Sequence, residues 1–180
     1  MSLPSKIIPM FTKVPLNAVE TEFHGSYNTL LGMVFPPDSD FTVIPHFTPC
    51  SAESAHDRVS FKVTFKDQPV LILELKHPSN LRYASKRRLA DHQSRDLIVQ
   101  LNEDHCPLPV LHVISAMGTK LCFYSKHQDA HCIQPSYIST CPYETDTAPV
   151  ERWNYDIREE EGLQKFITII REIKQGCADL

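Results

Sequence analysis

Glycine is scarce in this sequence, and its scarcity excludes several kinds of site. The chain has only five glycines in 180 residues, and they form no phosphate-cradling G-x-G-x-x-G or G-x-x-x-x-G-K loop. A dinucleotide-binding fold is therefore not expected. The G-x-S-x-G turn of the α/β-hydrolases and the H-E-x-x-H zinc motif are absent as well.

Long apolar runs and paired cysteines are also lacking. No stretch of about 18 apolar residues occurs, so no transmembrane helix is expected. The opening residues, MSLPSKIIPMFTKVPLN, are interrupted by prolines and contain no apolar core of signal-peptide length. The six cysteines include no CxxC pair, and without a secretion signal they indicate reduced thiols. These features predict an intracellular protein, cytoplasmic or nuclear, with no membrane association.

The composition is that of an ordinary globular protein. Apolar residues make up 42% of the chain and charged residues 22%, which predicts one folded domain over residues 1–180. The formal net charge of −4 argues against a protein that coats nucleic acid through bulk positive charge. A local basic groove remains compatible with it, because net charge does not describe distribution.

Hydrophobic periodicity predicts an α/β fold. The prolines within residues 1–14 predict an extended N-terminal arm without helix or strand. The elements predicted after it are a helix over 15–34, strands over 41–47, 57–65 and 70–76, a helix over 81–101, strands over 110–116 and 121–124, an irregular segment over 126–150 and a helix over 155–174. We expect a central mixed sheet of four to five strands flanked by helices. Its core spans about 15–125, and the last helix packs on the sheet.

Two charges interrupt an otherwise apolar strand. Glu74 and Lys76 alternate in VLILELK, so their side chains point to the same face. If 57–65 and 70–76 form a hairpin, Asp57 lies beside them. Two neighbouring carboxylates favour a divalent cation with oxygen ligands, Mg²⁺ or Mn²⁺, and a nearby lysine suits activation of water or stabilisation of a phosphate. Taken without the motif, Glu74 and Lys76 are more simply read as a strand-end ion pair, and Asp57 as a turn residue.

Asp57 followed by Glu74-Leu75-Lys76 resembles the signature of the PD-(D/E)xK nuclease superfamily, and the predicted element order is similar to its restriction-endonuclease-like core. The pattern also resembles nuclease-like modules of fungal and effector proteins. The resemblance implies a metal-dependent endonuclease, and it implies two further site residues. They are an acidic residue on the first helix, for which Glu20 is preferred over Glu22, and Gln93 on the helix after the ExK strand.

The resemblance also assigns roles within this set. The implied catalytic residues are Glu20, Asp57, Glu74, Lys76 and Gln93, and the implied metal ligands are Glu20, Asp57, Glu74 and the backbone carbonyl of Leu75. Two positions depart from the family pattern. His56 precedes Asp57 in place of proline, and Leu97 stands four residues after Gln93, where the family often has a tyrosine.

The implied partner is nucleic acid, with DNA expected ahead of RNA, and a homodimer is left open. The basic residues predicted to contact phosphates are Arg82, Lys86, Arg87, Arg88 and Arg95. A basic run such as the one over 86–88 is more often simply an exposed helix face. The alternative function is a nuclease-like fold that has lost catalysis and binds nucleic acid or protein.

Histidines and cysteines offer two weaker alternatives. His24 lies one helical turn after Glu20 and would favour Mn²⁺ if it joined the ligands, although a histidine bonded to a neighbour is the simpler reading. A zinc site is the other alternative, and its candidate ligands are His127, His131, Cys132 and Cys141. Their spacing matches no closed zinc motif, so zinc is disfavoured.

Overall fold

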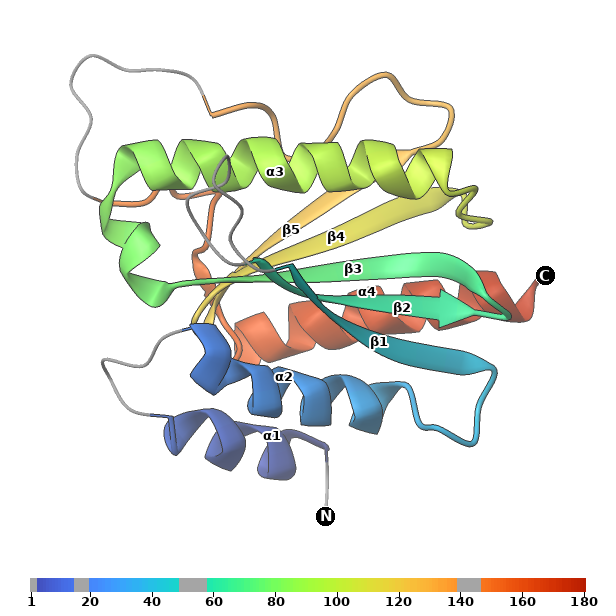
Figure 1. Cartoon of the computed structure of the whole chain (residues 1–180), viewed down its shortest axis with the longest axis horizontal. Coiled ribbons are helices and arrows are strands. Elements are labelled where there is room, and N and C mark those ends of the chain that lie inside the picture. The colour runs from blue at the N-terminus through green and yellow to red at the C-terminus, as the bar shows by residue number, and fades with distance from the viewer. Residues whose placement is uncertain (1–2, 15–19, 49–57, 139–146) are drawn as a thin grey trace.

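The fold is organised around one mixed β-sheet. The computed structural model describes residues 3–14, 20–48, 58–138 and 147–180. Within these ranges six strands follow one another across the sheet in chain order (Figure 1). They are β1 (Phe41–Thr48), β2 (Arg58–Phe65), β3 (Gln68–Lys76), β4 (Val110–Met117), β5 (Lys120–His127) and β6 (Tyr155–Asp156). The α/β class is as predicted, and β6 adds a strand beyond the expected four to five.

One neighbouring pair of the described strands in the sheet is parallel, and the other four pairs are antiparallel. The β1–β2, β2–β3, β4–β5 and β5–β6 pairs are antiparallel, whereas β3 and β4 are parallel. A parallel pair needs a crossover connection, and this one consists of the 3₁₀ helix η1 (Pro78–Arg82) and α3 (Ala84–Glu103). β3 is buried from Pro69 to Leu75, as expected for a central strand covered on both faces.

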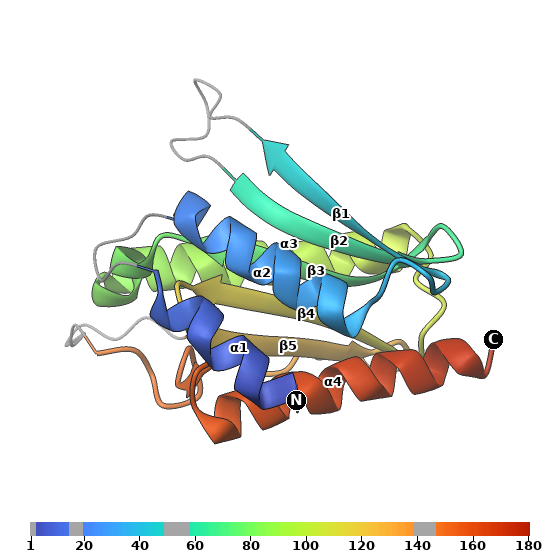
Figure 2. The same cartoon turned by 90° about the horizontal axis from the view of Figure 1, so that it is seen from below.

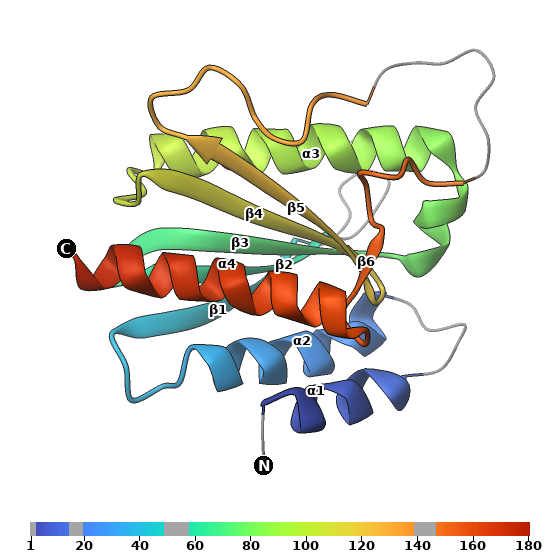
Figure 3. The same cartoon turned by 180° about the vertical axis from the view of Figure 1, so that it is seen from behind.

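Helices cover both faces of the sheet. α3 lies along one face, and α1 (Leu3–Thr12), α2 (Glu20–Val34) and α4 (Glu160–Ala178) lie on the other (Figure 2). Seen from behind, α4 crosses the strands on the side away from α3 (Figure 3). This three-layer arrangement buries side chains on both surfaces of the sheet.

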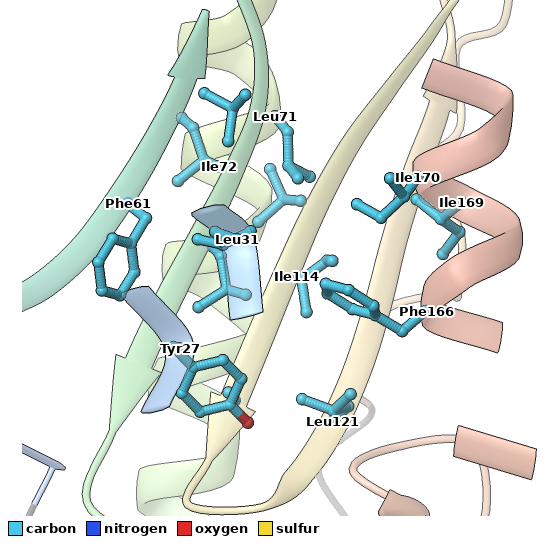
Figure 4. Packing of buried hydrophobic residues seen from close by; sticks show 14 of the residues in the cluster. Tyr27, Leu31, Phe61, Leu71, Ile72, Ile114, Leu121, Phe166, Ile169 and Ile170 are labelled. Atoms are coloured by element: carbon cyan, nitrogen blue, oxygen red, sulfur yellow. The ribbon is translucent and has the colours of Figure 1, made fainter. Parts of the chain in front are cut away.

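The core between the sheet and the second helical layer is dense and aromatic. Figure 4 shows Phe166 of α4 beside Ile114 of β4, with Tyr27 of α2 on the side of Phe61. All four side chains are fully buried, and each contributes roughly 1.5–3 kcal/mol of burial free energy. The prediction that the last helix packs on the sheet is confirmed.

The predicted extended arm is wrong, because residues Leu3–Thr12 form α1. Proline interrupts a helix when its missing N–H and its ring disturb the preceding turn, and Pro9 does lie inside this helix. Ile7 and Phe11, four residues apart, are nevertheless both buried. Their packing against the core compensates for the proline.

Two predicted boundaries also change. β3 begins at Gln68 and not at residue 70, because Lys66 and Asp67 adopt positive φ angles of 46° and 67° and make a two-residue hairpin turn. The predicted helix over 155–174 begins later, at Glu160, since Tyr155 and Asp156 form β6. Glu160 and Glu161 lie in the first turn of α4, where the helix dipole favours negative charge.

Candidate functional site

Glu74 and Lys76 lie at the end of β3 on the face covered by α3. The Glu74 side chain is 2% exposed and the Lys76 side chain 12%. Lys76 Nζ donates to Glu74 Oε1 at 2.7 Å. A buried carboxylate is costly to desolvate unless a cation and hydrogen bonds compensate, and the ammonium supplies both. The strand alternation therefore produces the predicted shared face.

Gln93 joins this pair from α3. Its Oε1 accepts a second hydrogen bond from Lys76 Nζ, and its side chain is half-buried. An ammonium has three donors, so Glu74 and Gln93 together occupy two of them and fix the position of Nζ. Three of the five predicted catalytic residues thus meet in one cluster, drawn from the central strand and the crossover helix. We call Glu74, Lys76 and Gln93 the lysine cluster.

Ser115 and Trp153 extend the cluster across the sheet. Ser115 on β4 is in parallel register with Glu74 and is fully buried. Trp153 Nε1 donates to Ser115 Oγ at 3.3 Å, and Trp153 is itself only 2% exposed. Sequence reasoning missed both residues. The available signals were a serine inside an apolar strand and the single tryptophan of the chain.

Two predicted acids cannot be placed. Asp57 lies outside the described residues, and so does the side chain of Glu20, whose backbone begins α2. Leu75 is buried on β3 and its side chain points to the face opposite Glu74. In the described ranges no group of three or more His, Cys, Asp or Glu side chains is placed to hold a metal ion. The predicted Mg²⁺ or Mn²⁺ site stays a prediction.

Arg87 and Arg95 both form hydrogen bonds within the fold. Arg87 is 4% exposed and its Nη1 donates to the Leu81 carbonyl at 2.8 Å, so it ties η1 to α3. Arg95 Nε donates to Asp91 at 3.0 Å, and its Nη2 donates to the Pro135 carbonyl at 2.7 Å. Both guanidinium groups are used inside the packed structure. The expectation that Arg87 and Arg95 contact phosphates along a nucleic acid stays a prediction.

The remaining basic residues lie nearer the surface. Arg82 is exposed at the end of η1, and Lys86 and Arg88 are half-buried in the first half of α3. The helix begins just after the strand that carries Lys76. These three residues can therefore present positive charge on the side of the molecule where β3 ends.

Asp91 is the centre of a second buried polar group, which we call the Asp91 network. Asp91 is fully buried; Tyr124 O–H donates to its Oδ1 at 2.9 Å, and Arg152 Nε does so at 3.4 Å. Burial, followed by the nearby charges and by the hydrogen bond to Asp91, raises the pKa of Tyr124 far above its usual value. The phenol therefore remains a donor at any physiological pH.

The other histidines and cysteines do not assemble into a site among the described residues. The His24 ring packs on Phe61 with centroids 4.9 Å apart. His127, His131 and Cys132 are exposed, and Cys141 lies outside the described part of the chain. Free thiols are found at Cys106, Cys122, Cys132 and Cys177. Burial is the main cause that raises the pKa of Cys122 to about 11, which leaves this thiol unreactive.

Comparisons with family models, with curated proteins and with solved structures found no match. No described helix has the length and apolar character that crossing a bilayer requires.

Proposed function

We propose that this chain is a metal-dependent nuclease that hydrolyses phosphodiester bonds in DNA or RNA. One observation carries the proposal: the Lys76 ammonium is held between Glu74 and Gln93 at the end of the central strand. A fixed ammonium beside a buried carboxylate suits the positioning of a water and the stabilisation of negative charge on a phosphate.

The topology supports the same proposal. A meander of three antiparallel strands is followed by a crossover helix and a strand parallel to the third. This order and these directions are similar to those of the restriction-endonuclease-like core. Glu74 and Lys76 stand on the third strand and Gln93 on the crossover helix, which are the elements that carry the ExK residues and the glutamine in PD-(D/E)xK nucleases.

The donor chemistry fits a hard divalent cation. Glu74 supplies a buried carboxylate, the type of ligand that Mg²⁺ and Mn²⁺ prefer. We propose that Asp57, Glu20 and the Leu75 carbonyl complete the ligand set with Glu74. The bound cation would polarise the phosphate and lower the pKa of a coordinated water.

The other site residues would position the water and bind the phosphates. Lys76 would donate to the attacking water or to a phosphate oxygen, and Gln93 would hold the ammonium in position for that contact. Arg82, Lys86 and Arg88 would bind the phosphate backbone beyond the cluster. Each such contact adds to the salt dependence of binding.

A second function is favoured by one specific observation. Glu74 and Lys76 neutralise each other at 2.7 Å with little solvent access, which is also what an ion pair serving only the fold looks like. The corresponding function is a nuclease-like fold without catalysis that binds nucleic acid or protein.

Cleavage assays separate the two functions. Plasmid DNA and structured RNA are incubated with the protein and Mg²⁺, Mn²⁺ or chelator, alongside Glu74→Gln, Lys76→Met and the exposed control Glu160→Gln. A nuclease should lose at least about a hundredfold of its rate in the two cluster variants and all of it with chelator. The control should retain full activity. Thermal unfolding of each variant establishes that the loss is not loss of the fold.

A thermal-shift measurement tests the cation directly. Mn²⁺ should raise the melting temperature of the wild type, because a ligand that binds only the native state stabilises it. Asp57→Ala should abolish that shift. A Mn²⁺-induced shift that survives in Asp57→Ala would contradict the proposed cation site. Binding of nucleic acid without any cleavage would contradict the enzyme and favour the binding module.

A further inference from the structure

A pocket opens between η1 and the segment 147–154. Its volume is about 430 Å³, within the range of small-molecule sites. The walls are mostly apolar and are formed by Leu81, Ala148, Pro149, Val150 and Trp153. Polar groups in the lining come from Arg82, Thr147, Arg152 and Asn154, and all of them except the buried Arg152 are exposed.

Trp153 and η1 link the pocket to the strands around the lysine cluster. Trp153 is a pocket residue, and its Nε1 bonds to Ser115, the strand neighbour of Glu74. η1, which forms the opposite wall, begins two residues after Lys76. The pocket is therefore connected to the strands that carry Glu74 and Ser115 through Trp153 on one side and η1 on the other.

Val150 adds an exposed apolar edge to the pocket. It is 82% exposed, the highest value among the exposed large apolar side chains in the described part of the chain, and it lies in the lining of the pocket. A single exposed valine is ordinary, but here it stands beside an apolar wall and an exposed guanidinium. The apolar wall, the exposed valine and the guanidinium together match a ligand that has a flat apolar ring, polar edges and an attached negative charge.

We propose that this pocket binds an unpaired nucleobase of a single-stranded nucleic acid, with the adjoining phosphate on Arg82. The base would pack against Pro149 and Val150, and its edge would bond to Asn154 or Thr147. A paired base cannot enter, because its edge and both faces are occupied within the duplex. The inference rests on the proposed function, since it names the substrate class of the same site.

Binding measurements in the Glu74→Gln background test the pocket without cleavage. Fluorescence anisotropy compares a short single-stranded DNA, the same sequence as RNA, and the corresponding DNA duplex. Ala148→Trp fills the pocket with an indole, and Val150→Ser removes one wall of it. Val99→Trp, at an exposed position on α3, is the control for an added surface aromatic. Thermal unfolding accompanies each variant.

We expect the single strand to bind more tightly than the duplex. Ala148→Trp should weaken single-strand binding about tenfold and Val150→Ser about threefold, as the loss of base packing implies, with duplex binding unchanged. The DNA and RNA arms identify which sugar is preferred. Equal binding of single strand and duplex, or single-strand affinity in both pocket variants equal to that of Val99→Trp, overturns the proposal.

Failure of the pocket and failure of the proposed function give different results. Normal metal-dependent cleavage together with unchanged affinity in the pocket variants refutes the pocket alone. Absence of cleavage with every substrate and cation refutes the nuclease, while the binding comparison still decides the pocket.

Discussion

His112 is a buried imidazole in β4 whose surroundings disfavour its charged form. Its side chain is 8% exposed, and its Nε2 lies 3.9 Å from Glu172 Oε2. Burial, with smaller contributions from the charges of Lys165 and His127, lowers its pKa from 6.5 to about 4. The native protein therefore holds this residue neutral in a pH range where the unfolded chain protonates it.

This difference predicts an acid-sensitive fold. The native pKa is depressed, so the stability is fully present above pH 6.5 and is lost as the pH falls from 6.5 towards 4. One proton contributes about 1.4 kcal/mol per pH unit, and the full loss is up to about 3 kcal/mol. Urea unfolding between pH 7.5 and 4.5 should show a shallower decline in His112→Gln than in the wild type. Parallel pH profiles would contradict the assignment.

Some residues of the candidate site could be predicted from the sequence and others could not. Alternation in VLILELK placed Glu74 and Lys76 on one face, because strand geometry alone fixes that relation. Gln93 could be proposed only through the family resemblance. Ser115 and Trp153 were missed because their contact joins β4 to a segment 38 residues later along the chain. No local pattern encodes such a pairing.

At the scale of elements, the start of α4 is fixed by a close approach to β6. A Cβ on Gly162 would lie 2.1 Å from the Asp156 carbonyl oxygen, so only glycine fits without a backbone shift. Asp156 is also held by Arg158 and Lys120 at 2.8 and 3.4 Å. Burial works to raise the pKa of Asp156, but the hydrogen bonds and charge of Arg158, with Lys120, keep it below its usual value.

Two glycine variants should therefore have opposite effects. Gly162→Ala should lower the free energy of unfolding by about 2 kcal/mol, since β6 or α4 must move. Gly25→Ala is the matched control in α2, where an added Cβ meets nothing within 4 Å. It should raise stability by about 0.5–1 kcal/mol through helix propensity. Equal effects in chemical denaturation would show that the approach at Gly162 relaxes freely.

Helices and strands with a long hydrophobic periodicity were predicted well, whereas elements that form only through tertiary packing were missed. The strands and α3 appear within a few residues of their expected ends. α1 was missed because its prolines are typical of a segment without regular structure. The burial of Ile7 and Phe11 that stabilises this helix depends on the rest of the fold. β6 has two residues, and only its neighbour β5 defines it.

At the scale of the whole molecule, the Asp91 network joins segments far apart in sequence. Asp91 of α3 bonds to Tyr124 of β5 and to Arg152, and the Ile138 N–H donates to it at 3.4 Å. Arg152 is 4% exposed. Removing the carboxylate charge would leave buried cations without compensation.

Asp91→Asn should accordingly destabilise the whole fold. We expect a loss of about 3 kcal/mol or more, as for other broken buried ion pairs. Asp96→Asn is the control on the same helix, because Asp96 is 64% exposed and pairs with His92 at 3.3 Å. That pair should contribute less than about 1 kcal/mol. Similar melting temperatures for the two variants would contradict the role assigned to Asp91.

The parallel pairing of β3 with β4 has a consequence for the order of folding. The antiparallel meander β1–β2–β3 needs only short turns, whereas β4 reaches β3 after η1 and α3 have been traversed. Contacts across such a long loop close slowly. Glu74 and Lys76 belong to the meander, whereas Gln93 lies on the crossover helix α3 and joins them only when that helix packs on the sheet. We therefore expect the lysine cluster to assemble late in folding, together with the slow closure of the β3–β4 pair.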